Sequence, residues 1–469
     1  MATENNMVVG QPMLLLRTTF KWSLVIFMQA GALHAAPAVY PVKVSANHRY
    51  LVDQNDKPFL ITGDSPQSLM VNLSTAQADA YFSNRVAHGF NTMWINLVCD
   101  TYTGGRKDGS AFDGMFPFTD YLPGGGKDLA HFDLSKPNEA YFARCDEMMK
   151  LAVKYNLLVF LDPLEPGGFM TNMLNNGRDA CFAYGKFVGN RYKGFDNIVW
   201  LNGNDFQTWR KPADDAVATA VAKAIQESDP RHIHTIELDY NVSLSTDDPT
   251  WAALVSLNAA YTYYPTYAEV LKGYNYPGTM PVFMIESTYD FEDNVQAHVA
   301  TPGTLRREEY WSDLSGATGL IYGNHYTWTF AQGWQTHLDT PGAAQIAFLK
   351  SFFESRPWQN LVPDQDHKIL TDGFGTFSSK GTIDANDYAT AARTPDGRLV
   401  IVYAPTIREL TVDMSKLNGS ATARWFDPSN GAYIAIDGSP IANEASHKFT
   451  PPGRNHDGDA DWVLVLEAN

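Results

Sequence analysis

Eight short apolar runs alternate with amphipathic stretches between residues 59 and 326, and this alternation constrains the fold more than any other feature of the chain. Each run has the length of a β-strand that is buried on both faces. Strands alternating with helices form a parallel sheet, and eight repeats predict closure into a (β/α)8 TIM barrel. A doubly wound open sheet is the alternative, although no G-x-G-x-x-G motif follows the first run. The runs cover residues 59–63, 92–98, 157–164, 198–201, 232–238, 254–260, 282–285 and 319–322.

The stretches between the runs carry helix start and stop signals. Ser74 caps a helical pattern that ends at Gly89, and further patterns open at Pro137, Pro212 and Thr304. After residue 356 the pattern changes to short β-rich segments separated by turns, which predicts a small antiparallel β-sandwich. We therefore expect a catalytic barrel over residues 37–356 and a C-terminal sandwich over residues 357–469.

The first 36 residues have the features of a secretory signal peptide. Arg17 and Lys21 form a positive flank, residues 22–28 are apolar, and small residues near Ala32 and Ala35 suit cleavage. The apolar run is far shorter than the roughly 20 residues that a membrane anchor needs. We expect a secreted or periplasmic protein with no integral membrane segment.

Charge and cysteine content exclude several classes of protein. The formal net charge of -17 argues against a nucleic-acid partner, which needs a concentrated basic surface. Three cysteines, Cys99, Cys145 and Cys181, allow one disulfide at most, and we expect them to be buried as small apolar side chains. We expect neither a metal ion nor a cofactor, and the sequence is silent on the oligomeric state.

Two of the apolar runs end in carboxylates that suit the cleavage of a glycosidic bond. Asp205 follows the fourth run and Glu286 follows the seventh. Catalytic groups of a barrel lie at the C-terminal ends of its strands, and three steps around eight strands place these two on facing walls. We assign Asp205 as general acid/base and Glu286 as nucleophile of a retaining double displacement; a gap of about 5 Å supports retention, and a wider one inversion.

Further polar and aromatic side chains at the same rim are candidates for binding substrate. Asn204 precedes the acid and is a candidate donor to the sugar 2-hydroxyl, while Tyr263 is expected to orient the Glu286 carboxylate. Flat aromatic side chains stack on the C–H faces of sugars. The other candidates for substrate contact are Asp64, Asn96, Asp162, His325, Trp328 and Trp334.

The order and spacing of several segments resemble a known family. The sequences at 58–64, 89–92, 190–200, 281–286 and 316–323 together resemble the apiosidase-like (β/α)8 proteins, glycoside hydrolase family 140. The resemblance covers about residues 41–356, and a collagen-binding-type β-sandwich follows in many relatives. It implies a metal-free, retaining glycoside hydrolase with its acid/base at Asp205 and its nucleophile at Glu286. Removal of apiose from plant pectic side chains is the activity that it implies at family level.

Two other functions remain open on the sequence alone. The first is a metal-dependent hydrolase on the same barrel, for which His232 and His234 are the best support, although they open the fifth strand at the end away from the catalytic rim. The second is a carbohydrate-binding barrel that has lost turnover, against which the presence of both carboxylates argues.

Overall fold

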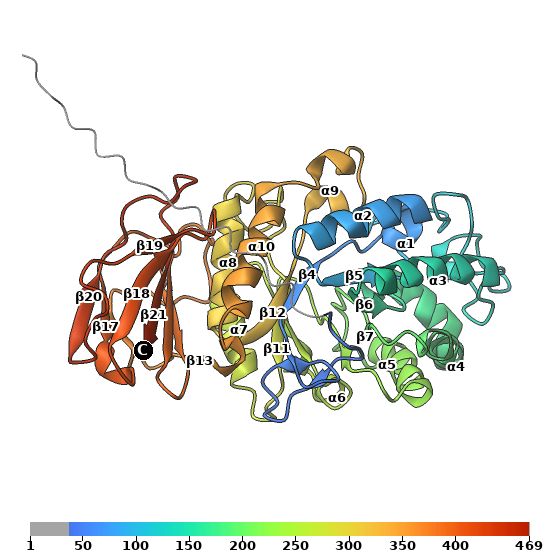
Figure 1. Cartoon of the computed structure of the whole chain (residues 1–469). Coiled ribbons are helices and arrows are strands. Elements are labelled where there is room, and N and C mark those ends of the chain that lie inside the picture. Colours follow the sequence, from blue (N-terminus) through green and yellow to red (C-terminus); the bar gives the residue numbers. More distant parts are fainter. Residues whose placement is uncertain (1–36, 469) are drawn as a thin grey trace, which may run out of the picture. The chain divides into compact units, whose positions relative to one another are not determined.

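The computed structural model describes residues 37–468, and these contain the predicted barrel (Figure 1). Each parallel strand pairs with the next in the order β8-β7-β6-β5-β4-β12-β11-β10, and β9 (Val242–Leu244) joins β10 in antiparallel fashion. The predicted signal peptide lies outside the described residues. The parallel strands are β4 (Ile61–Asp64), β5 (Thr92–Asn96), β6 (Leu158–Asp162), β7 (Ile198–Leu201), β8 (His234–Thr235), β10 (Asn258–Thr262), β11 (Val282–Glu286) and β12 (Ala317–Tyr322).

Loop hydrogen bonds close the barrel between β8 and β10. The backbone N–H of Leu257 donates to the His234 carbonyl at 3.3 Å. The hydroxyl of Ser245 donates to the Ile236 carbonyl at 2.5 Å and accepts from the Ala259 N–H at 2.8 Å. The Ser245 side chain thus forms hydrogen bonds that the backbone of a longer β8 strand would otherwise form. The predicted strand over 232–238 is correspondingly short, with two residues in regular β-structure.

Helices cover the outside of the barrel and begin at the residue types that the sequence indicated. Ser74 forms a capping box with Gln77 at the start of α2, and Pro212 opens α5. Two predicted starts are wrong by two residues: α3 begins at Glu139 and not at Pro137, and α8 begins at Pro302 and not at Thr304. The main covering helices are α2 (Thr75–Ala87), α3 (Glu139–Lys154), α4 (Pro166–Tyr192), α5 (Pro212–Ser228), α7 (Thr266–Tyr274), α8 (Pro302–Leu314) and α10 (Pro341–Glu354).

An apolar floor closes the N-terminal end of the barrel. The small antiparallel sheet of β1 (Lys43–Val44), β2 (Leu51–Val52) and β3 (Pro58–Phe59) contributes Leu51 and Phe59 to the same cluster as the inward-facing barrel residues. Phe160 and Phe283 meet inside that cluster with ring centroids 5.1 Å apart. Because the interior is filled, a ligand can reach only the C-terminal ends of the strands.

The C-terminal region is an antiparallel sandwich that packs against α8. One sheet has the order β13-β15-β16-β21-β18-β19 and the other β14-β17-β20, with an apolar core between them. The strands are β13 (Val362–Pro363), β14 (Leu370–Asp372), β15 (Thr390–Arg393), β16 (Leu399–Ala404), β17 (Leu410–Asp413), β18 (Ala421–Phe426), β19 (Tyr433–Ala435), β20 (Ser446–Phe449) and β21 (Trp462–Ala468). The predicted fold class, a barrel followed by a small sandwich, is confirmed (Figure 1).

Two predictions about small features can also be checked. Cys99, Cys145 and Cys181 are all buried and unpaired, as expected. Among residues 37–468, no helix combines the length and the apolar character needed to cross a bilayer.

Candidate active site

The turn after β7 carries Asp205 to the mouth of the barrel through backbone conformations that few residues adopt. Val199 and Leu201 point into the interior. Beyond them Gly203 has φ 124° and Asp205 has φ 47°. A Cβ at Gly203 would lie 2.2 Å from Cδ of Pro166, so only glycine fits there. This sharp turn holds Asp205 half-buried instead of letting the strand continue.

Glu286 ends β11, and a β-bulge turns its side chain into the same mouth. Ile285 points into the interior, so strict alternation would direct Glu286 outward to the helices. The register against β10 shifts instead, because Ala260 pairs with Met284 and the next residue, Tyr261, pairs with Glu286. Bulges re-aim side chains in this way next to active sites.

Two tyrosine hydroxyls hold the Glu286 carboxylate. Tyr263 donates to Oε1 at 2.6 Å, and Tyr289 donates to Oε2 at 2.8 Å. The contact that the sequence predicted between Tyr263 and Glu286 is therefore present. Tyr289 packs directly on Gly323, where a Cβ would lie 2.2 Å from its ring, and it receives a hydrogen bond from Gln67 at 3.2 Å.

Asp205 is held through its backbone and by a tyrosine that the sequence reasoning missed. The Asp205 N–H donates to Oε2 of the buried Glu237 at 3.1 Å. The Tyr102 hydroxyl hydrogen-bonds the Asp205 side chain and accepts from Nδ2 of Asn204 at 3.2 Å. Tyr102 lies in an irregular loop after β5, where no periodic pattern singles it out. Gly167 permits this approach, since a Cβ there would meet both the Tyr102 hydroxyl and Cβ of Asp205 within 3 Å.

Burial is the largest cause that raises the pKa of both catalytic candidates. Burial raises the pKa of Asp205 to about 7, and burial followed by the charge of Asp205 raises the pKa of Glu286 to about 8. Like charges at close range disfavour double ionisation, so we assign both values to the pair, which shares a proton near neutral pH. One protonated and one ionised carboxyl is the state that glycosidic cleavage requires.

A chain of aromatic and polar contacts continues from Tyr289 to the outer rim. The ring of Trp328 packs edge-on against Tyr289 with centroids 6.2 Å apart. Oε1 of Glu292 accepts from Trp328 Nε1 at 3.0 Å and lies 3.1 Å from His325 Nδ1. The half-buried Trp328 and the exposed His325 thus lie on the Glu286 side of the mouth, where the sequence placed candidates for substrate contact.

Four of the predicted substrate-binding residues lie buried in the structure. Asp64 is fully buried on the outer face of β4, where it accepts from the Tyr81 hydroxyl and pairs with Arg85 of α2. Trp334 packs on the ring of Tyr81 at 6.1 Å, with 7% of its surface exposed. In both cases the sequence shows the residue type but not the direction of the side chain.

Asn96 and Asp162 face the barrel interior below the mouth. Asn96 is completely buried. Its amide oxygen accepts from Trp94 Nε1 at 2.8 Å, and its amide nitrogen donates to Glu165 at 2.9 Å. Asp162 is also completely buried and accepts from the Leu164 N–H at 2.9 Å. These side chains support the wall of the site from beneath it.

The two histidines that favoured a metal site are engaged in structural contacts. His232 Nδ1 lies 2.6 Å from the Asp229 carboxylate, and His234 Nδ1 lies 3.1 Å from the Asn202 amide. Burial lowers the pKa of His234 to about 3. Within residues 37–468, no three His, Cys, Asp or Glu side chains are arranged to hold a metal ion.

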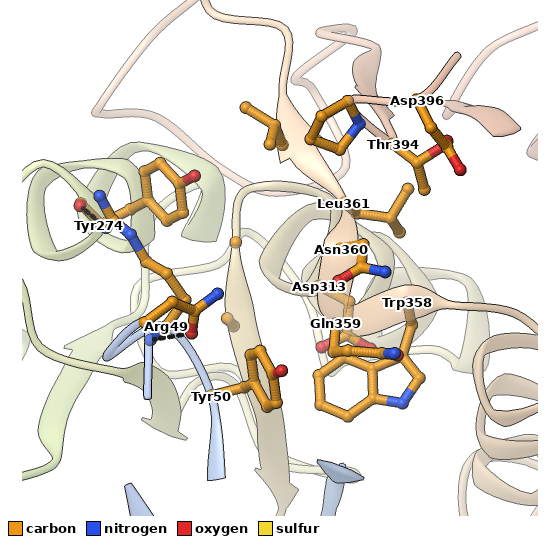
Figure 2. Close-up of a pocket in the computed structure, with 15 residues that line it drawn as sticks. Arg49, Tyr50, Tyr274, Asp313, Trp358, Gln359, Asn360, Leu361, Thr394 and Asp396 are labelled. Atoms are coloured by element: carbon orange, nitrogen blue, oxygen red, sulfur yellow. Dashed lines mark hydrogen bonds between the residues drawn. The ribbon is translucent and has the colours of Figure 1, made fainter. Parts of the chain in front are cut away.

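Figure 2 shows a cavity with a volume of about 330 Å³. It is lined by Tyr50 of the floor, Asp313 of α8 and Trp358 at the start of the C-terminal region, and the guanidinium of Arg49 stacks there on Tyr274 at 4.1 Å. None of its lining residues belongs to the set around Asp205 and Glu286, so it takes no part in the chemistry described above.

Comparison with known families agrees with this geometry. Residues 45–360 match the family described as "Apiosidase-like, catalytic domain". The chain belongs to the apiosidase-like family. Residues 378–467 of this apiosidase-like chain match the family described as "Putative collagen-binding domain of a collagenase". No curated protein matches the chain.

Two solved structures with the same fold are described as glycoside hydrolases. One glycoside hydrolase has 21% sequence identity and a TM-score of 0.74, over 91% of this chain and 97% of that one. A glycoside hydrolase family 5 protein from Bacteroides vulgatus ATCC 8482 has 20% identity and a TM-score of 0.74, over 91% and 93%. At this identity the likeness shows the fold, while the family match covers the catalytic domain. The apiosidase-like chain is a glycoside hydrolase that acts on carbohydrate.

Proposed function

We propose that this apiosidase-like protein cleaves its substrate by a retaining double displacement, with Glu286 as nucleophile and Asp205 as general acid/base. The observation that carries this proposal is the difference in hydrogen bonding between the two acids. Both oxygens of Glu286 accept from phenol hydroxyls, which favours the ionised form that a nucleophile needs. A proton placed on Glu286 would weaken the hydrogen bond to the oxygen that carries it.

Asp205 is the better place for the shared proton. Its side chain has one tyrosine partner, Tyr102, and burial is the main cause of its raised pKa. A protonated Asp205 can donate to the leaving glycosidic oxygen while Glu286 attacks the anomeric carbon. Once the leaving group departs, the ionised Asp205 removes a proton from the water that hydrolyses the glycosyl-enzyme.

Other residues at the mouth would bind the sugar that reacts. Asn204 Oδ1 is buried without a partner, and its amide lies beside the acid/base, where we place the 2-hydroxyl of the substrate. Trp328 offers a ring face on the Glu286 side, and His325 offers an exposed polar edge. These assignments place the reacting sugar between Tyr289 and Asp205.

The substrate class is proposed from the family. The family match supports a plant-type polysaccharide or oligosaccharide, with apiose as the first sugar to test. The positive flank and apolar run of the first 36 residues support export to the periplasm or the medium. N-terminal sequencing of protein recovered from the medium or periplasm tests export, which predicts a start near residue 36.

A substrate screen with paired variants tests this function. The purified protein is incubated with aryl glycosides and plant polysaccharides, alongside Glu286→Gln, Asp205→Asn and the control Glu354→Gln, which changes an exposed carboxylate of α10. We expect Glu286→Gln and Asp205→Asn to lose about 10²- to 10⁴-fold in kcat, and Glu354→Gln to match the parent protein. Full turnover by Glu286→Gln would refute the assignment of the nucleophile.

A further inference from the structure

The inward side chain that follows β8, Glu237, touches the catalytic turn but has no place in the reaction proposed above. It is 1% exposed, and its Oε2 accepts from the Asp205 N–H at 3.1 Å. Its own backbone N–H donates to the Gly203 carbonyl at 3.0 Å. Glu237 therefore bonds both ends of the three-residue turn that presents the acid/base.

That turn needs such a clamp because its backbone is strained. Asp205 has φ 47°, a conformation that side-chain-bearing residues adopt rarely and at a cost of about 1–3 kcal/mol. Strained residues persist where their surroundings hold them in place. Without the hydrogen bond to Glu237, Asp205 can relax to an ordinary conformation, and its carboxyl then leaves the glycosidic oxygen.

The surroundings of Glu237 also decide its charge. The charged groups that act on it most strongly are the carboxyls of Glu286, Asp205 and Asp162, and its Oε1 has no hydrogen-bond partner. The phenols of Tyr102, Tyr261 and Tyr289 also lie within electrostatic reach. Burial and this repulsion raise the pKa of Glu237. A third negative charge here would oppose the ionised nucleophile, whereas a neutral carboxyl still accepts the Asp205 N–H.

We propose that Glu237 is a positioning residue, which holds the acid/base turn through a neutral carboxyl group and transfers no proton to substrate. This inference rests on the role of Asp205 proposed above. It makes a specific statement about charge: an uncharged acceptor of the same shape serves as well as glutamate. The Glu237→Gln substitution keeps an oxygen for the Asp205 N–H, whereas Glu237→Leu keeps the volume but offers no acceptor.

The test compares Glu237→Gln with Glu237→Leu on two aryl glycosides. Both variants and Asp205→Asn are assayed on the 4-nitrophenyl and 2,4-dinitrophenyl forms of a glycoside that the parent protein cleaves, after thermal unfolding has shown that each is folded. We expect Glu237→Gln to keep kcat within about threefold and to keep the parent pH profile. Glu237→Leu should lose about 10²-fold in kcat on the 4-nitrophenyl glycoside, as a misplaced catalytic group does.

The dinitrophenyl glycoside separates positioning from other damage, because its leaving group departs without protonation. On it, the loss of kcat/KM, which reports the first displacement alone, should shrink about tenfold in Glu237→Leu, in parallel with Asp205→Asn. The inference is overturned if Glu237→Gln is as inactive as Glu237→Leu, or if Glu237→Leu is fully active. If Asp205→Asn itself shows no dependence on the leaving group, then the proposed role of Asp205 fails, whatever the Glu237 variants do.

Discussion

At the scale of single residues, the Glu286 carboxylate depends on two phenol hydroxyls that can be removed one at a time. Tyr263→Phe and Tyr289→Phe each delete one hydrogen bond to a charged group, worth about 1.5–3 kcal/mol. We expect kcat/KM to fall about 10- to 100-fold in each variant. Tyr388→Phe, which removes a phenol in the C-terminal region, is the matched control. Unchanged kcat/KM in both site variants would mean that Glu286 is not the group that reacts.

The shared proton makes a second prediction at this scale. The values of about 7 and 8 for Asp205 and Glu286 imply that the pair loses its last proton as the pH rises through this range, so kcat/KM should decline there. In the active state Asp205 carries the shared proton and Glu286 the charge, so Asp205 is uncharged at the pH where Glu286 first ionises. Asp205→Asn should therefore remove the alkaline limb of the pH profile, measured on a dinitrophenyl glycoside, and leave the acid limb in place. An alkaline limb that persists in Asp205→Asn would show that Asp205 does not hold the shared proton.

At the scale of elements, the turn between β7 and α5 is set by one glycine. Gly203→Ala adds a Cβ that meets Pro166 at 2.2 Å and must adopt φ 124°. We expect at least a tenfold loss of kcat, because Asp205 shifts with the turn. Gly194→Ala is the control, since a Cβ there meets nothing within 4 Å. Equal activity of the two variants would contradict the importance of the turn.

Strand ends were predictable from sequence, but the directions of their side chains were not. The alternation of apolar runs and helices gave the barrel, and the run before Glu286 gave the position of a carboxylate at the mouth. Asp64 ends its strand in the same manner, yet its side chain faces α2, because the alternation of side chains along the strand directs this position outward. The same alternation would direct Glu286 outward, and only the β-bulge turns its side chain inward. A bulge depends on pairing with a distant strand, which a linear pattern does not record.

The residues that hydrogen-bond Asp205 and Glu286 also differ in how far the sequence predicts them. Tyr263 lies two residues beyond the inward-facing Tyr261, so its direction follows from the strand period. Tyr102 comes from an irregular loop, and Glu237 depends on a hydrogen bond to a neighbouring turn. Contacts of this kind become visible only when the strands are assembled.

At the scale of the whole molecule, a buried arginine joins α8 to the C-terminal sandwich. Arg306 is 1% exposed and forms ion pairs with Asp461 at 2.9 Å and Asp459 at 2.7 Å. Arg306→Met leaves the buried Asp461 without its cation, which should destabilise the protein by about 3–5 kcal/mol. Chemical denaturation measures this loss, with the exposed Arg398→Met as control. A loss below about 1 kcal/mol would mean that this ion pair does not stabilise the packing.

The central claim is that the apiosidase-like barrel cleaves its substrate in two displacements at one carbon. The most direct test follows the hydrolysis of an aryl glycoside by proton NMR and records the anomeric configuration of the sugar that is released first. The account predicts the same anomer as the substrate, because Glu286 and water each invert the centre once. Release of the opposite anomer would contradict it, since Glu286 would then act as a base on water and form no bond to the sugar.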